Sequence, residues 1–171
     1  IQYGARLSGK IDKNWRIAAM DMQTGKVEED GLPTQNFAVV ALQRRVFARS
    51  NVGLLVVNKE SVNYTPPDSG SVYSEYNRNL GFEYNLASSN NLWTGKALFL
   101  KSFSPQQTEK DYTYAANLQY STRKFTVSGQ YEYVGSGYTA EVGYVPRNNY
   151  IRVNPQASYL FFPKSEKILS H

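Results

Sequence analysis

Alternation of apolar and polar residues with a period of two is the feature that most constrains this chain. It is clearest in two consecutive segments, 112–121 and 125–133, which a short turn separates. Side chains along a β-strand point to opposite faces in turn, so this pattern is typical of strands with one apolar face. Two strands joined by so short a turn must pair antiparallel. The residues predicted on the apolar face of this hairpin are Tyr112, Tyr114, Ala116, Leu118 and Tyr120, then Phe125, Val127, Gly129, Tyr131 and Tyr133.

The same period predicts strands along the rest of the chain, where helical periodicity is nearly absent. The alternation is clear at 3–10, 79–86 and 151–161. Four further segments carry apolar residues on both faces, so their orientation is not assigned: 15–23, 36–46, 51–59 and 92–103. We expect about nine strands of roughly eight to twelve residues, whereas soluble strands average about five to six and tilted membrane strands need about nine to eleven.

Connections of two lengths alternate strictly along the sequence. The short ones are 11–14, 47–50, 87–91 and 122–124, and the longer ones are 25–35, 60–75, 104–111 and 135–148. In an up-and-down sheet this places every long connection at one end, as in outer-membrane barrels. We therefore predict one domain over 1–171: an all-β, antiparallel up-and-down meander that forms part of a transmembrane outer-membrane β-barrel. An odd strand number indicates a segment of a larger barrel, because single-chain bacterial barrels have even numbers.

Aromatic residues make up 14% of the chain, with 14 tyrosines, 8 phenylalanines and 2 tryptophans. Several stand at opposite ends of one strand face, and eight residue steps at a tilt near 45° cover roughly 19 Å. This span approaches the apolar band of about 25 Å that aromatic girdles flank in membrane barrels. The residues predicted to face lipid or form the girdles are Trp93, Phe103, Tyr112, Tyr120, Phe125, Tyr133, Tyr159 and Phe161.

Charged side chains collect on the opposite strand faces. The residues predicted to face the lumen are Arg6, Lys10, Glu83, Lys96, Glu132 and Arg152. Such mixed charges more often form cross-strand ladders than substrate sites. Glu83 and Glu132 also raise the alternative of a glycosidase pair, which requires two carboxyls about 5–10 Å apart. In the long connection after 134, Arg147 is expected to fold back on luminal carboxylates.

Several function classes are excluded or disfavoured by composition. Cysteine is absent and the one histidine is His171, so thiolate sites and Ser-His-Asp catalysis are excluded within this segment. The net charge of +5 is dispersed, which argues against nucleic-acid binding. The acidic connection residues Glu28, Glu29, Asp30 and Asp68 do not have EF-hand spacing and are interpreted as solvated. We expect no catalytic activity, no cofactor and no metal here.

Five segments resemble a known family: YGARLSGKIDKNWRIAAMDMQTG, TQNFAVVALQRRVFARSNVGLLVVNKE, EYNRNLGFEYNL, LWTGKALFLKSFSP and YTAEVGYVPRNNYIRVNP. They are similar to the β-barrel region of large Bacteroidota-type outer-membrane proteins of unassigned function. In that family the barrel follows an N-terminal domain similar to family-nine carbohydrate-binding modules. The resemblance implies a bacterial outer-membrane location, a barrel that extends beyond both ends of this chain, and a link to surface glycan handling. It supplies no catalytic or ligand-binding residue.

Two functions of different classes remain. The first is a membrane-embedded barrel component that contacts outer-membrane lipid, the rest of the barrel and a sugar-binding-like domain, and serves as anchor, pore or translocation scaffold. The alternative is a soluble all-β module that binds glycan or protein through exposed tyrosines. They differ in what the face with Tyr112, Tyr114, Leu118 and Tyr120 contacts: lipid in one case, a second sheet or a sugar in the other.

Overall fold

The computed structural model describes residues 1–64, 73–106 and 109–161, and this part of the chain forms one sheet of nine strands. The strands are β1 (Tyr3–Lys10), β2 (Trp15–Gln23), β3 (Gln35–Val46), β4 (Ser50–Ser61), β5 (Tyr76–Ala87), β6 (Trp93–Phe103), β7 (Tyr112–Ser121), β8 (Phe125–Val134) and β9 (Tyr150–Tyr159). The described residues contain no helix. The predicted all-β antiparallel meander is therefore confirmed.

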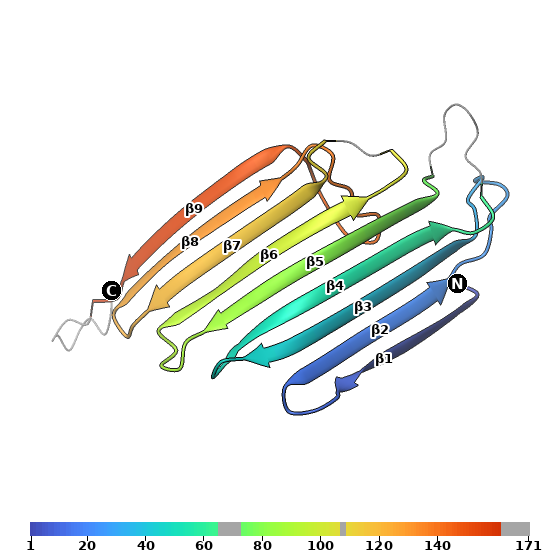
Figure 1. The fold of residues 1–171 in the computed structure, drawn as a ribbon. Coiled ribbons are helices and arrows are strands. Elements are labelled where there is room, and N and C mark those ends of the chain that lie inside the picture. The colour runs from blue at the N-terminus through green and yellow to red at the C-terminus, as the bar shows by residue number, and fades with distance from the viewer. Residues whose placement is uncertain (65–72, 107–108, 162–171) are drawn as a thin grey trace, which may run out of the picture.

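Each strand pairs antiparallel with the next one in sequence, in the order β1 to β9 (Figure 1). The hairpin predicted from alternation is present, with Ala116 opposite Tyr131 and Leu118 opposite Gly129. β1 and β9 form the two outer edges and do not pair with each other, so the sheet is open. The structure therefore confirms the predicted meander, and the larger transmembrane barrel of which it was predicted to be a part is not confirmed.

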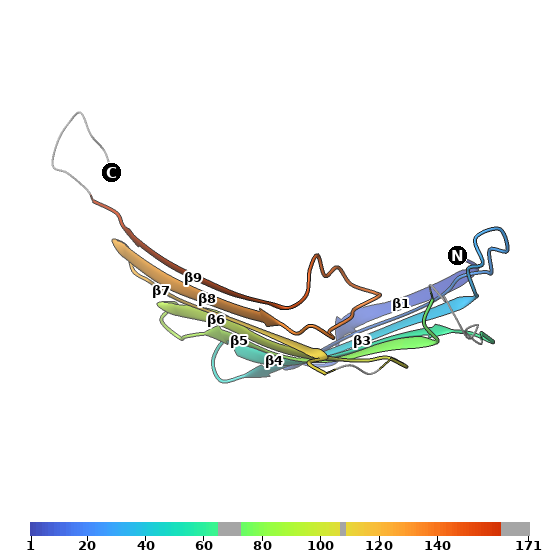
Figure 2. The same cartoon turned by 90° about the horizontal axis from the view of Figure 1, so that it is seen from above.

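The sheet is curved, as the view from above shows (Figure 2). The connection 135–149 rises from the sheet on its concave side. We call this side the concave face and the other the convex face. Because directly paired residues share a face, the strand register assigns every strand residue to one of them.

The predicted alternation of connections is present. The short turns 11–14, 47–49, 88–92 and 122–124 lie at one end of the sheet. The strands joined by the longer connections 24–34, 62–75, 104–111 and 135–149 end and begin at the other (Figure 1). Polar side chains fix the turns: the Asp12 carboxylate accepts hydrogen bonds from the backbone N–H groups of Asn14 and Trp15, at 2.6 and 2.8 Å. We call the two ends the short-turn end and the long-connection end.

The sheet has almost no hydrophobic core of its own. Within the described residues, the buried hydrophobic side chains are those of Val134 and Tyr138. Large apolar side chains are instead exposed, for example Phe82 (53%) and Val153 (66%). The strand backbone is thus satisfied by cross-strand hydrogen bonds, while one apolar face is left uncovered.

β9 contains a proline, Pro155, opposite Gly129 of β8. The Leu160 N–H donates to the Lys124 carbonyl at 2.7 Å, so Leu160 and Lys124 form a hydrogen-bonded pair. In an antiparallel ladder, hydrogen-bonded and non-hydrogen-bonded pairs alternate along the two strands. By that alternation the Pro155 nitrogen points away from β8. The lack of an N–H on Pro155 therefore removes no hydrogen bond between β8 and β9. The position where that N–H would be lies on the free edge of the sheet.

Candidate functional site

The convex face carries a continuous row of apolar side chains across eight neighbouring strands. By register this row is Ile17, Leu42, Leu54, Phe82, Phe99, Tyr114, Tyr133 and Ile151. The next row toward the short-turn end includes Val52, Tyr84, Ala97, Ala116, Tyr131 and Val153. We call these two rows the apolar belt. It resolves the orientation of the strands whose faces could not be assigned from sequence.

Aromatic residues concentrate beside the apolar belt. Trp93 packs against Tyr120 near the short-turn end, with ring centroids 4.9 Å apart. Toward the long-connection end, Tyr112 and Tyr114 stack with their centroids 6.4 Å apart. By register and strand parity, the convex face holds seven of the eight residues predicted as lipid-facing or girdle aromatics: Trp93, Phe103, Tyr112, Tyr120, Phe125, Tyr133 and Tyr159. Phe161 follows β9 and is 55% exposed.

Cations lie over aromatic rings at both ends of the convex face. At the short-turn end the Arg44 guanidinium lies 5.2 Å from the Trp15 ring centroid. At the long-connection end Arg78 lies 4.6 Å from the Tyr76 ring. Long basic side chains of this kind place their methylene stems on apolar surface and their charge toward water. The apolar belt is thus bordered on both sides by amphipathic residues.

The concave face is predominantly polar. By register it holds all six charged residues predicted to share a polar face: Arg6, Lys10, Glu83, Lys96, Glu132 and Arg152. Four of them form two ion pairs between strands. Lys96 Nζ lies 2.8 Å from Glu83 Oε2, and Arg152 Nη2 lies 2.6 Å from Glu132 Oε2, although that contact is not aligned as a hydrogen bond.

Amide side chains extend the Lys96–Glu83 pair into a ladder across the concave face. Asn85 donates to Glu83 at 3.1 Å and to Asn51 at 2.8 Å, and Gln43 donates to Asn51 at 2.7 Å. The ion pair with Lys96 and the hydrogen bond from Asn85 thus hold the Glu83 carboxylate in place. Cross-strand ladders of this kind fix strand register and provide a hydrated polar surface.

Glu83 and Glu132 do not have the spacing of a glycosidase pair. Leu98 of β6 and Ala115 of β7 lie between them in one cross-strand row. Three steps at the spacing of neighbouring strands place their backbones roughly 14 Å apart. In addition, each carboxylate is held by its own cation, Glu83 by Lys96 and Glu132 by Arg152, and the two are not arranged as a glycosidase pair with carboxyls roughly 5–10 Å apart.

The connection 135–149 folds onto the concave face at the long-connection end, and we call it the inward segment. Its Thr139 accepts a hydrogen bond from Asn77 of β5 at 2.9 Å, and the Thr139 N–H donates to Ser102 of β6 at 3.2 Å. The Tyr138 side chain is 4% exposed, and this burial raises the pKa of its phenol above the ordinary value. The inward segment thus covers part of the concave face.

An ion pair fastens the inward segment to the sheet. Glu141 Oε2 lies 2.8 Å from the Nζ of Lys59, whose side chain is only 3% exposed. The Lys59 ammonium also donates to the Ser74 carbonyl at 3.2 Å. Arg147 lies over the ring of Tyr150 at 4.7 Å, and it forms no ion pair with a carboxylate of the described residues. The expected contact of Arg147 with luminal carboxylates is therefore not seen in the described residues; instead, Glu141 of the segment pairs with Lys59 of the sheet.

Sequence reasoning missed Lys59, Asn77 and Glu141. Asn77 is fully buried, and nothing in the local pattern around it distinguishes it from an exposed strand asparagine. The one usable signal was polar residues at concave positions of β4 and β5 close to the long-connection end. In the inward segment, Glu141 lies in YTAEVGYVPRNNYIRVNP, one of the five segments that carry the resemblance.

The acidic residues of the 24–34 connection do not form a metal site. Glu28 pairs with Lys26 at 3.2 Å, and both side chains are largely exposed. Across the described residues no group of three or more potential metal ligands lies together. Asp68, the fourth residue of the predicted acidic set, and His171 lie outside the described residues.

No protein-family model matches the chain, and no match is found among curated proteins or among solved structures. Within the described part of the chain, no helix has the length and apolar character needed to cross a membrane. The resemblance to the outer-membrane family therefore stays a prediction.

Proposed function

We propose that this chain is part of an outer-membrane β-barrel that serves as anchor, pore or translocation scaffold. The apolar belt faces lipid in this proposal, and the concave face lines an aqueous lumen. The observation that carries it is the apolar belt itself, which spans the sheet, lies between aromatic and cationic borders, and is uncovered by any other described residue.

The physical argument starts from the cost of exposing this face to water. Contiguous apolar patches beyond a few hundred Å² are rare on monomeric soluble proteins and indicate a binding surface or a membrane contact. Lipid fits this patch because tyrosine and tryptophan at its borders place their rings in the interface and their polar groups in water. Strands of 8 to 12 residues also have the length that a tilted membrane strand needs.

The concave face and the connections support the same proposal. Charged and amide residues on the concave face suit a water-filled interior, and the sorting of short and long connections to opposite ends is typical of outer-membrane barrels. The inward segment resembles the loops that plug or narrow such barrels. By that analogy the long-connection end faces the outside of the cell.

The open edges of β1 and β9 require partners in this setting. Hydrocarbon offers no hydrogen bonds, so spanning strands must pair on both sides. We propose that strands outside the described residues complete the barrel. The sheet then contributes nine strands to a larger wall.

Single cysteines on neighbouring residues of β7 test the proposal, since this chain has no cysteine of its own. Leu118→Cys lies on the convex face, and Asn117→Cys, the matched control, lies on the concave face. In native membranes we expect a lipid-phase probe to react with Cys at 118 and a water-soluble thiol reagent to react only with Cys at 117. Recovery of the protein without membranes, with both positions open to the aqueous reagent, would falsify the barrel.

Two further cysteines test the orientation. Tyr144→Cys in the inward segment is at a position that is 89% exposed, and Ala48→Cys lies in the exposed turn 47–49 at the other end. On intact cells, an impermeant reagent should label position 144 and leave position 48 unlabelled until the outer membrane is opened. The reverse labelling would place the long connections on the periplasmic side.

A further inference from the structure

Three basic side chains of the concave face stand together near the short-turn end. Lys10 of β1 and Arg16 of β2 are directly paired in register, and Arg16 is paired with Gln43 of β3. Arg45 lies two residues beyond Gln43 on the same face, and one guanidinium nitrogen donates a hydrogen bond to the Ala48 carbonyl at 2.6 Å. Directly opposite side chains have Cβ atoms about 5 Å apart and diagonal ones roughly 7–8 Å. Like charges directly opposite each other, as Lys10 and Arg16 are, destabilise a sheet.

The acids near these cations already have partners. Of the described residues that line this part of the concave face, Asp12 and Glu83 are acidic. The Asp12 carboxylate caps its own turn, and Glu83 pairs with Lys96 at 2.8 Å. Lys13 and Arg49 add two more positive charges at the rim. The cluster therefore has an excess of positive charge that the protein itself does not neutralise.

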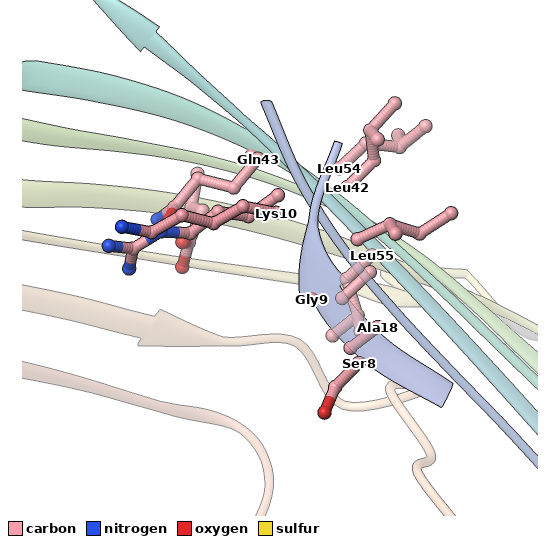
Figure 3. A pocket seen from close by; sticks show the side chains of 13 residues that line it. Ser8, Gly9, Lys10, Ala18, Leu42, Gln43, Leu54 and Leu55 are labelled. Atoms are coloured by element: carbon pink, nitrogen blue, oxygen red, sulfur yellow. The ribbon is translucent and has the colours of Figure 1, made fainter. Parts of the chain in front are cut away.

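A hollow opens directly beside these cations. It has a volume of about 500 Å³ and is floored by small or apolar residues, chiefly Ala18, Ala41, Gly53 and Leu55. In Figure 3 Lys10 and Gln43 extend to the same side, away from Leu42 and Leu54 of the convex face. A second hollow of about 300 Å³ lies on the other side of Lys10 and Arg16, toward Arg45. Volumes of 300–1,000 Å³ with few polar groups are typical of small-molecule sites.

We propose that this region binds a small, multiply charged anion with a phosphate-type group on a compact apolar body. The anionic group lies among Lys10, Arg16 and Arg45, where planar guanidinium groups bind oxyanions through paired hydrogen bonds. The apolar body lies in the hollow over Ala18 and Ala41, beside the Glu83 side chain that covers Gly53. The inference rests on the proposed function, because a concave face that lines a lumen meets dissolved ligands and not lipid headgroups.

Calorimetric titration of the whole purified protein in detergent tests the site, with inorganic phosphate and phenyl phosphate as probes at low ionic strength. We expect phenyl phosphate to bind more tightly than inorganic phosphate. Arg16→Gln and Arg45→Gln should each weaken both probes about tenfold, which corresponds to about 1.4 kcal/mol. Lys124→Gln removes the same charge from the exposed turn 122–124 at the same end of the sheet and should change nothing.

A hollow-filling variant separates the two parts of the proposal. Ala41→Leu should remove the advantage of phenyl phosphate and leave inorganic phosphate bound. The inference is overturned if neither probe binds, or if the arginine variants bind as the Lys124→Gln control does. Circular dichroism of each variant verifies that the sheet is intact. Membrane fractionation of cells that express the same variants tests separately whether the protein is in the outer membrane. A failed anion site and a failed barrel therefore give different results.

Discussion

Gly135, at the residue scale, controls where the inward segment leaves the sheet. It follows β8 directly, and its N–H donates to the Tyr112 carbonyl at 3.0 Å. A Cβ at this position would lie 2.7 Å from that carbonyl oxygen and would also overlap the Lys110 carbonyl. Both obstacles are backbone atoms, which side-chain rotation cannot move. The close approach of two chain segments therefore requires glycine here.

We predict that Gly135→Ala destabilises the protein by about 1–3 kcal/mol, the usual cost of forcing extra volume into a packed site. Gly129→Ala is the matched control, because a Cβ there would meet nothing within 4 Å. Urea unfolding of both variants in the same detergent measures the difference. Equal stabilities would show that the chain at 135 relaxes easily and that the close approach is unimportant.

The inward segment, at the element scale, depends on a few polar contacts with buried partners. The ion pair of Lys59 matters most among these contacts. The Lys59 ammonium is nearly buried, and without its counter-charge it would remain an unpaired charge away from water, which is strongly destabilising. Glu141 supplies that charge from a segment with little apolar burial beyond Tyr138. The docked position of the segment is therefore sensitive to one carboxylate.

Glu141→Gln should loosen the inward segment by about 1–3 kcal/mol, the range for leaving a buried polar group without its partner. Hydrogen exchange at the Thr139 amide, which donates to Ser102 Oγ, measures the loosening. Adding Lys59→Met should restore part of the protection, because the unpaired charge is then gone. Glu29→Gln, in an exposed connection, serves as the control. Unchanged exchange in Glu141→Gln would mean that Asn77 and Ser102 hold the segment without the ion pair.

The sequence predicted the strands well but not the placement of the inward segment. Strands with clear alternation, such as β7 and β8, could be oriented because one face is apolar. β3, β4 and β6 could not, because Val39, Leu55 and Leu100 add apolar residues to the concave face as well. Leu100, for example, fills the space above Gly81. Contacts such as Lys59 with Glu141 join residues far apart in sequence, and no local period reports them.

The apolar belt, at the scale of the whole molecule, has no second layer to pack against among the described residues. In a water-soluble protein, a charge added to an already exposed position would cost little. In a membrane barrel, lysine on the lipid face costs about 2–4 kcal/mol near the bilayer midplane. The two settings therefore predict different outcomes for the same substitution.

Leu118→Lys should sharply reduce the amount of protein assembled in the outer membrane, whereas Gln119→Lys, its neighbour on the concave face opposite Thr94 and Ser128, should assemble normally. Both positions are exposed, and Leu118 is 46% accessible. Quantifying folded protein in outer-membrane fractions measures the difference. If both lysine variants assemble equally, the convex face does not contact lipid.

Pro155 has a consequence for aggregation. An unpaired strand edge can template the addition of foreign strands, and proline is one of the residues that natural proteins place on edges to resist this. On the outer edge of β9 the absent N–H leaves an incoming strand with one carbonyl that lacks a donor, which is most costly where water is excluded. A chance strand from another chain therefore adds poorly to this edge during biogenesis. In the proposed barrel, the strand that pairs with this edge of β9 accommodates the gap, for example with a bulge opposite Pro155.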